Sequence, residues 1–269
     1  MTLVVGLAPI VAGCILGGTG DVATTEVGKG NDTEGVVTRV ADGDTVEVVV
    51  TGEVIEVRLV AVNAPDQGEC LADQALDHLV ETLRDRTVRL EVVGEDQFGR
   101  TLAHLFEGDR HVNVELVETG HAFASTPDES DPHADAIVQA ENEAYGSGAG
   151  IWGQDACGSH ESRPTATIDS DRSTVDPAGP DDEFLDEEAV AILNDGNEAV
   201  DLSGWILRDE STRHRFTFPD GTALGPGDRV MVASSNQGWD PGDSPVWNNG
   251  GDMALLQLPD GTVVSRWRY

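Results

Sequence analysis

The sequence predicts a mainly β protein of two domains, in which a small closed β-barrel with three helices (an α+β arrangement) precedes an antiparallel β-sandwich. The chain has 269 residues, and 39% of them are hydrophobic, which gives each of two ordinary domains enough apolar residues for a core. Residues 36–152 combine short alternating segments with amphipathic ones. Residues 183–269 contain short alternating segments only, separated by Gly, Pro and Asn.

Period-two alternation of β-branched residues marks the strands of the first domain. The expected strands are 36–41, 45–50, 54–62, 87–93 and 100–106, and the expected helices are 71–84, 113–119 and 132–145. In the first of these helices, Leu71, Ala75, Leu79 and Leu83 recur four residues apart and form one apolar face. Five strands and three helices in about 120 residues fit a small barrel with helices outside.

The second half begins after a change in composition. Residues 158–181 are rich in Ser, Thr, Pro, Asp and Gly, which predicts a linker. Six short strands are expected beyond it, at 188–194, 205–209, 214–218, 229–235, 253–258 and 262–267. Such regular spacing without a helix is typical of a β-sandwich, so the expected domains are 35–157 and 182–269.

Charge is the most unusual feature of the composition. Fifty acidic residues stand against 16 basic ones, and Lys29 is the one lysine. The acidic residues are spread along the polar phases of ordinary strands and helices, which favours adaptation of the surface to a very salty environment. At about 1 M salt the Debye length is about 3 Å, so long-range repulsion largely vanishes. The alternative is a specific acidic function, such as cation binding.

The N-terminus predicts export. Residues 1–20 contain an apolar run that is too short to span a membrane but long enough for a signal-peptide core, and 21–34 read as a flexible tether. The stretch 11–14 resembles a lipobox, which implies a lipidated Cys14 and attachment to the outer face of the cytoplasmic membrane. No Lys or Arg precedes the run, and an ordinary hydrophobic N-terminus is the alternative.

Two further cysteines remain, Cys70 and Cys157. In an exported protein they are candidates for a disulfide. Two free buried thiols are the alternative.

Residues 41–66 and the strand after Gly99 contain the side chains of a candidate site. Asp44 follows a glycine turn and Asn63 ends the third strand, so strand pairing can bring together oxygen atoms of the kind that Ca²⁺ prefers. Arg58 and Arg100 offer guanidinium groups shaped for phosphate, and Asp66 is a candidate base for a water molecule. Taken singly, each residue is more typical of a turn or a solvated strand face. Together they are the parts that phosphodiester hydrolysis needs.

The order of these residues resembles the thermonuclease family, the staphylococcal-nuclease-like domains. The motifs are VADGDTV at 40–46, VRLVAVNAPD at 57–66, GECLADQA at 68–75, FGRTLA at 98–103, VNVELVETGHA at 112–122 and GIWG at 150–153. The resemblance covers the whole first domain. It implies an OB-fold barrel and Ca²⁺-dependent cleavage of DNA and RNA.

The resemblance also implies roles for individual residues. Asp44 matches a Ca²⁺ ligand, Ala64 a ligand through its backbone carbonyl, and Arg58 and Arg100 the pair that binds phosphate and stabilises charge.

Two positions depart from the family pattern. Asn63 stands where the family generally has a second aspartate ligand, so the site has one charge fewer. Asp66 stands where the family has a glutamate that orients or deprotonates water, and it is one methylene shorter. Glu69 is a nearby carboxylate, but the family carries a glutamate there too.

Residues 182–269 resemble a lamin tail domain. The motifs are DEFLDEEAVAILNDGNEAVDLSGWILRD at 182–209, FTFPDGTALGPGD at 216–228 and VWNNGGD at 246–252. The resemblance implies an immunoglobulin-like sandwich without reaction chemistry, and we expect an attachment or binding domain whose partner the sequence does not identify.

The whole chain therefore predicts an exported, monomeric, salt-adapted nuclease that requires Ca²⁺ and acts on DNA or RNA. One alternative is a non-catalytic nucleic-acid-binding protein that uses the same barrel. Another is a surface adhesin with a vestigial nuclease domain.

Overall fold

The computed structural model describes most of the chain beyond the N-terminal segment. The described residues are 32–125, 130–160, 164–175, 185–210, 214–236, 238–240, 246–247 and 251–269. The signal segment, the tether and Cys14 lie outside these residues. Among the described helices, none is long and apolar enough to cross a membrane.

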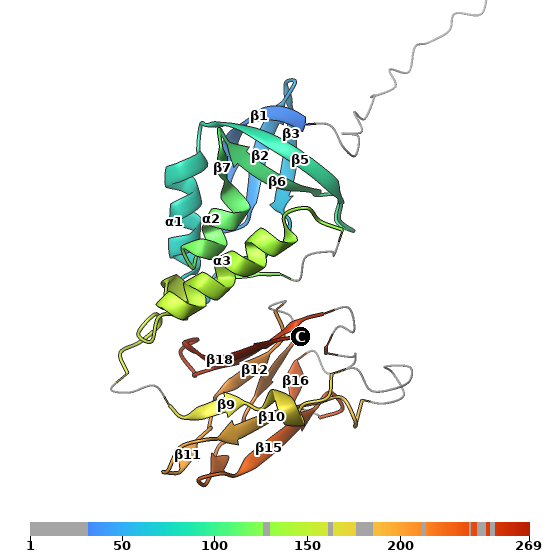
Figure 1. Ribbon diagram of the computed structural model, residues 1–269. Coiled ribbons are helices and arrows are strands. Elements are labelled where there is room, and N and C mark those ends of the chain that lie inside the picture. Colours follow the sequence, from blue (N-terminus) through green and yellow to red (C-terminus); the bar gives the residue numbers. More distant parts are fainter. Residues whose placement is uncertain are drawn as a thin grey trace, which may run out of the picture.

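The first domain is a five-stranded closed barrel (Figure 1). Its strands are β1 (Asp32–Val40), β2 (Thr45–Val50), β3 (Glu53–Leu59), β5 (Thr87–Glu95) and β6 (Thr101–Glu107). Neighbouring strands are antiparallel in the order β3-β2-β1-β5-β6, and a parallel pairing of β3 with β6 closes the barrel. This topology agrees with the small closed barrel predicted from the strand pattern and with the OB-fold implied by the family resemblance.

Short elements and three helices complete the domain. They are β4 (Val62–Asn63), α1 (Ala72–Leu83), β7 (Arg110–His111), α2 (Val112–Glu118), β8 (Phe123–Ala124), α3 (Ala134–Ser147) and the 3₁₀ turn η1 (Gly150–Trp152). Three of the four residues of the expected face of α1 are confirmed, because Ala75, Leu79 and Leu83 are fully buried. Leu71, the fourth, lies before the helix as its N-cap and is only partly buried. They pack with the inward residues of the strands, such as Val46 and Val57, in one core.

The second domain is an immunoglobulin-like sandwich. One sheet contains β15 (Arg229–Ala233), β10 (Ala189–Asn194) and β9 (Ala166–Ile168). The other contains β16 (Trp239–Asp240), β13 (Arg215–Thr217), β12 (Ile206–Arg208), β17 (Met253–Gln257) and β18 (Val263–Arg268). A two-stranded ribbon joins β11 (Val200–Asp201) to β14 (Ala223–Leu224). All six expected strands are present.

One part of the expected organisation is wrong. Residues 158–181 were expected to be a linker, but β9 and the 3₁₀ turn η2 (Ser170–Arg172) lie within this range. β9 pairs with β10 from Ala166 to Ile168, so the sandwich begins before residue 182. Only Ala166 of this strand is fully buried, and the strand is held mainly by backbone pairing, which leaves little apolar signal in the sequence.

The two domains pack directly on each other. In Figure 1, α3 of the barrel domain faces β18 of the sandwich. A shared apolar cluster fills this junction; its fully buried members are Phe123, Ala144, Ile151 and Trp152 from the first domain and Met253, Leu255 and Val263 from the second. Burial of apolar side chains from both domains in one cluster makes the junction a continuous piece of core.

Candidate active site

The glycine turn after β1 places Asp44 at one end of the barrel. Gly43 packs so closely that an added Cβ would lie 2.6 Å from the Cβ of Ala64 and 2.7 Å from the Cβ of Ala75. Only glycine permits this approach. The turn is therefore pressed between α1 and the chain after β4, which brings Asp44 next to Ala64.

Asp44 is a buried carboxylate that several donors hold in place. Its Oδ2 accepts a hydrogen bond from the backbone N–H of Ala64 (2.8 Å), and its Oδ1 accepts one from the hydroxyl of Thr45 (3.1 Å). Burial raises the pKa of Asp44 to about 6; Arg58 opposes this shift and Asp42 adds to it. The negative charge is thus only partly compensated by its protein neighbours.

Arg58 projects from the outer face of β3 into a ring of oxygen atoms. Its Nη2 lies 3.1 Å from Asp44 Oδ2 and donates to Oδ1 of Asn63 at 3.1 Å. Its Nη1 donates to the carbonyls of Leu59 (2.6 Å) and Val62 (2.7 Å). The guanidinium therefore connects two of the predicted metal ligands, and its orientation is fixed by the backbone around it.

The chain reverses after β3 so that Asn63 returns toward Arg58. Ala61 adopts a left-handed conformation with φ of 59°, which is uncommon for a residue with a side chain. The short strand β4 then pairs with β8, opposite Phe123. At this point the Oδ1 of Asn63 accepts a hydrogen bond from Arg58. Its Nδ2 donates to the backbone carbonyl of Glu210, in the second domain, at 2.9 Å.

Arg100 lies on the same outer face of the barrel as Arg58. β3 and β6 run parallel with Arg58 opposite Leu102, so Arg100 is two residues from that position and on the same side of the sheet. Its guanidinium pairs with Asp96 (2.7 Å) and lies 5.7 Å from the centre of the Phe98 ring. Phe98 is 75% exposed. Strand alternation, continued one residue before β6, therefore puts the two arginines on one side of the sheet, and each pairs with its own aspartate.

Asp66 is exposed and lies in the loop after Ala64, beside the glycine turn that carries Asp44. It lines a pocket of about 300 Å³ together with Asp42 and Asp73. Its backbone N–H donates to Oε2 of Glu69 at 2.9 Å. Because Asp42 also accepts the backbone N–H of Asp44 (3.0 Å), this pocket borders the glycine turn.

The oxygen atoms around Asp44 suit a hard divalent cation in their chemistry. Asp44 supplies a partly compensated buried carboxylate, Asn63 an amide oxygen, and Ala64 a backbone carbonyl, all of which are ligand types for Ca²⁺. Within the described residues, no group of three His, Cys, Asp or Glu side chains is arranged to hold a metal. A cation here would thus depend on a single carboxylate together with neutral oxygens.

Cys70 and Cys157 form a disulfide. The bond ties the loop that carries Asp66 and Glu69 to the C-terminal end of the barrel domain, 87 residues later. Closing a loop of this length stabilises the folded state by about 4 to 5 kcal/mol in the chain-entropy model.

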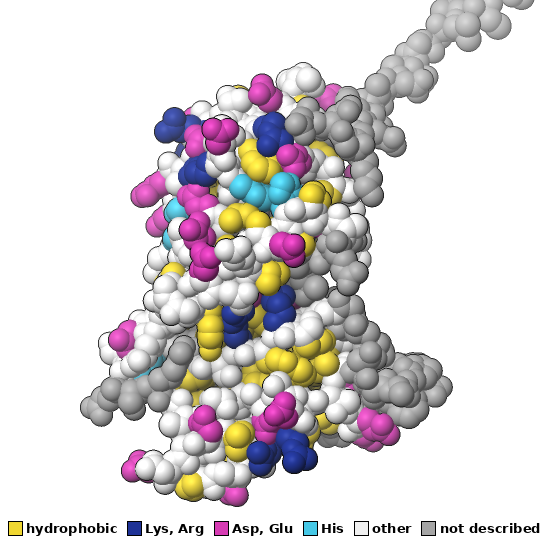
Figure 2. Space-filling model, in the orientation of Figure 1, with side chains coloured by type: hydrophobic (Ala, Val, Ile, Leu, Met, Phe, Trp, Pro, Cys, Tyr) yellow, Lys and Arg dark blue, Asp and Glu magenta, His cyan; other side chains and the backbone are white. Residues whose placement is uncertain are grey.

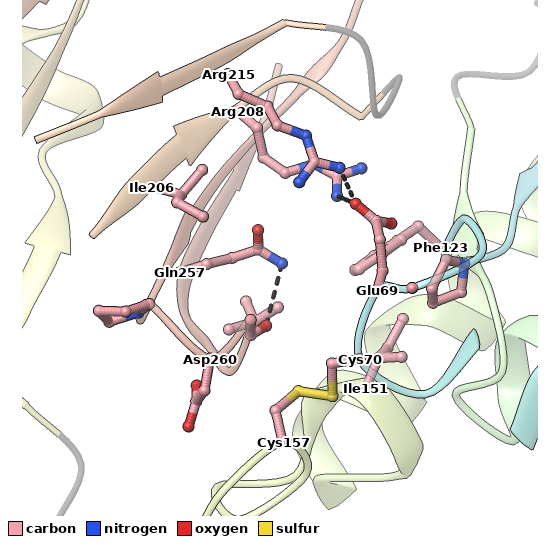
Figure 3. A pocket seen from close by; sticks show the side chains of 15 residues that line it. Glu69, Cys70, Phe123, Ile151, Cys157, Ile206, Arg208, Arg215, Gln257 and Asp260 are labelled. Atoms are coloured by element: carbon pink, nitrogen blue, oxygen red, sulfur yellow. Dashed lines mark hydrogen bonds and ion pairs between the residues drawn. A yellow bond between two sulfur atoms is a disulfide. The ribbon is translucent and has the colours of Figure 1, made fainter. Parts of the chain in front are cut away.

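Two arginines of the sandwich reach this loop and were not expected from the sequence. Figure 3 shows Arg208 and Arg215 converging on Glu69 across a pocket between the domains, near the disulfide. Nη1 of Arg208 lies 3.5 Å from Oε1 of Glu69, and Arg215 contacts the same oxygen. Burial lowers the pKa of both arginines, and the charge of Asp66 opposes the shift in each. A sequence signal existed: basic residues are outnumbered 50 to 16 by acidic ones, yet Arg208 lies in an expected strand of the sandwich.

Comparisons with known proteins agree with the two domains of this fold. A family profile described as staphylococcal nuclease homologue matches residues 56–154, and one described as lamin tail domain matches 162–269. A protein named thermonuclease from Staphylococcus intermedius is 33% identical over 129 residues, which cover 44% of this chain and 74% of that protein.

Two relatives named uncharacterized endonuclease align with the same part of the chain. The protein from Haemophilus influenzae is 31% identical over 117 residues, which cover 43% of this chain and 64% of that protein. The protein from Escherichia coli O157:H7 is 30% identical over 122 residues, which cover 45% of this chain and 78% of that protein.

The barrel and its relatives define a class of phosphodiesterases, the nucleases with an OB-fold. The chain belongs to the staphylococcal nuclease homologue family and carries a lamin tail domain behind the nuclease domain.

Proposed function

We propose that this protein is an exported, salt-adapted nuclease that hydrolyses phosphodiester bonds of DNA or RNA and depends on Ca²⁺. The observation that carries the proposal is the position of Arg58, which lies beside Asp44 on the same barrel face as Arg100. This combination of a buried carboxylate and two guanidinium groups occurs in a chain of the nuclease family.

The arginines bind and stabilise the phosphate. Arg58 and Arg100 exchange the carboxylates that they now face, Asp44 and Asp96, for phosphoryl oxygens. Each guanidinium can form two parallel hydrogen bonds to a phosphate, and these strengthen as negative charge develops during hydrolysis. Removal of one such donor typically lowers the rate by about 10²- to 10³-fold.

Asp66 accepts a proton from the attacking water. Its exposed carboxylate lines the pocket next to the glycine turn, which a water molecule can enter. Asp44, Asn63 and the carbonyl of Ala64 would hold the cation, which when bound supplies Lewis acidity and offsets phosphoryl charge. The P–O bond to the leaving nucleotide breaks as the water oxygen bonds to phosphorus.

Digestion of single-stranded DNA in high salt tests this function. Wild-type protein with Ca²⁺ is expected to digest the substrate, chelation of the metal is expected to stop digestion, and Arg58→Ala and Arg100→Ala are each expected to abolish it. Arg39→Ala is the matched control, because Arg39 also pairs with a carboxylate, Glu47, but is 58% exposed and lies on β1. Digestion unchanged in both active-site variants would refute the proposal.

Export is proposed on the sequence of residues 1–20, with lipidation of Cys14 as the anchor. Incorporation of a labelled fatty acid into the expressed protein, and its loss in Cys14→Ser, would support this. Fractionation of the unprocessed chain with the cytosol would contradict it.

The second candidate function is nucleic-acid binding without cleavage. The observation that favours it is that Arg58 is already surrounded by four oxygen atoms of the protein, while Asp66 is shorter than the glutamate of the family. DNA binding without cleavage at any Ca²⁺ concentration would select this alternative.

A further inference from the structure

The lamin tail domain is attached to the barrel domain by buried ion pairs as well as by the shared apolar cluster. Glu141 of α3 is fully buried, and its Oε2 pairs with Arg266 (2.6 Å) and Arg268 (3.0 Å) of β18. Arg268 also donates to the carbonyl of Ala124 at 2.7 Å. Both of these arginines belong to the other domain, so the buried carboxylate ties the domains together: separation would leave it without these partners.

Glu69 forms a separate contact between the domains, next to Asp66. Its Oε1 faces Arg208 and Arg215 of the tail, while its Oε2 accepts the backbone N–H of Asp66. Arg208 is 1% exposed and its guanidinium carbon lies 5.7 Å from the centre of the Phe123 ring. One carboxylate therefore joins two arginines of the tail to the residue proposed as the base.

Asn63 forms a second connection, to Arg58. A guanidinium can only donate hydrogen bonds, so the amide oxygen of Asn63 must face Arg58 and the amide nitrogen must face the carbonyl of Glu210. An aspartate, the usual family residue, could not donate to that carbonyl. Asparagine at this position therefore suits the contact with the tail, which an aspartate could not make.

The Cys70–Cys157 disulfide also packs against the tail. A Cβ added to Gly261, in the turn between β17 and β18, would lie 3.1 Å from the Cβ of Cys70, and the backbone of Gly261 has φ of +95°. The turn of the tail therefore packs on the bond that closes the 65–70 loop.

We propose that the lamin tail domain is an integral part of the nuclease site, which it positions through Glu210 on Asn63 and through Arg208 and Arg215 on Glu69. The inference rests on the proposed nuclease function. Asn63 and Glu69 are positioning residues: they orient Arg58 and Asp66. Arg208 and Glu141 are almost fully buried, so salt screens their ion pairs much less than it screens exposed pairs.

Full-length variants test this proposal. Arg208→Gln combined with Arg215→Gln removes both charges that hold Glu69. We expect kcat to fall about tenfold or more and the Ca²⁺ concentration for half-maximal activity to rise, measured well below the unfolding temperature. Arg229→Gln is the matched control, because Arg229 also pairs with an aspartate, Asp169, but lies in the sheet of β15, β10 and β9. This control is expected to retain the parent kcat.

A second variant, Asn63→Asp, separates the effect of the contact between Asn63 and the tail from the effect of metal binding. The added charge is expected to tighten Ca²⁺ binding in a calorimetric titration, whereas the lost bond to Glu210 is expected to lower the temperature of thermal unfolding without Ca²⁺. Parent values of kcat in the double variant, or an unchanged unfolding temperature in Asn63→Asp, would overturn the proposal. If the parent chain digests no nucleic acid, the proposed function fails, and the metal-free unfolding comparison still decides whether the tail is coupled to Asn63.

Discussion

At the residue scale, the protonation state of Asp44 controls whether the proposed cation site has any charge. Burial raises the pKa of this carboxyl to about 6, so it loses its charge in mildly acidic solution. Only the ionised form binds a cation well, because a proton and a metal ion compete for the same oxygens.

The pH dependence of Ca²⁺ activation follows from this. Below pH 6, the Ca²⁺ concentration for half-maximal activity is expected to rise about tenfold per pH unit, and above pH 7 it is expected to be constant. Activity assays between pH 5 and 8 at several Ca²⁺ concentrations measure this, and saturating Ca²⁺ should restore much of the rate. A half-maximal concentration that is independent of pH over this range would contradict the role of Asp44.

The length of Asp66 makes a separate prediction. Asp66→Glu restores the methylene that the family has at this position, and a positional error of about 1 Å can cost on the order of 100-fold in rate. We therefore expect kcat to rise by about one to two orders of magnitude. Asp73→Glu is the control, because it adds the same methylene to another carboxylate that lines the pocket. An equal rise in both variants, or none in Asp66→Glu, would exclude Asp66 as the base.

At the scale of elements, β6, β7 and the start of α3 bring three histidines together. His104, His111 and His133 have ring centres 4.5 to 5.1 Å apart. Asp131 binds His104 (2.9 Å), and Glu91 binds His133 (2.8 Å). Burial lowers the pKa of His104, and it lowers the pKa of His111 to about 4 with help from the other two histidines.

This cluster predicts loss of stability in acid. A histidine whose folded pKa lies below its unfolded value of about 6.5 binds its proton first in the unfolded chain. The free energy of unfolding is therefore expected to be fully retained above pH 6.5 and to decline as the pH falls from 6.5 toward 4. Urea unfolding across this range measures the slope.

A variant isolates the contribution of the cluster. His111→Gln removes one titrating ring and is expected to flatten the acid slope, whereas His160→Gln, which changes a histidine that pairs with Asp260, serves as the control. An identical slope in wild type and His111→Gln would show that other groups cause the acid sensitivity.

At the scale of the whole molecule, the net charge of −34 governs the approach of a polyanionic substrate. Acidic side chains are spread over the visible face in Figure 2, while basic ones also occur at the junction of the two halves. Four of the arginines, Arg208, Arg215, Arg266 and Arg268, pair with carboxylates at this junction. The surface therefore repels nucleic acid in dilute buffer, and salt reduces that repulsion.

Salt is thus expected to activate the enzyme. Nucleic-acid binding ordinarily weakens as salt is added because the protein displaces counterions. Here that loss is expected to be blunted or reversed, since the Debye length falls to about 3 Å at 1 M and only short-range contacts remain. Digestion rates measured from low salt to several molar test this, and an activity maximum below about 0.2 M would contradict salt adaptation.

The elements of both domains were largely predictable because their signals are local. Alternating residues such as those of β2 and the four-residue spacing of Leu79 and Leu83 each fix a strand or a helix without reference to the rest of the chain. β9 was missed because pairing with β10 holds it and only Ala166 is deeply buried.

The sequence by itself determined the two-domain order, the barrel and the residue types of the site, because alternation, turn chemistry and motif order are carried by neighbouring residues. The tertiary structure decided which groups those residues meet. It showed Arg58 between Asp44 and Asn63, and it brought Glu210 to Asn63 from 147 residues away. Contacts between distant segments depend on how complete domains pack, and no local pattern encodes that packing.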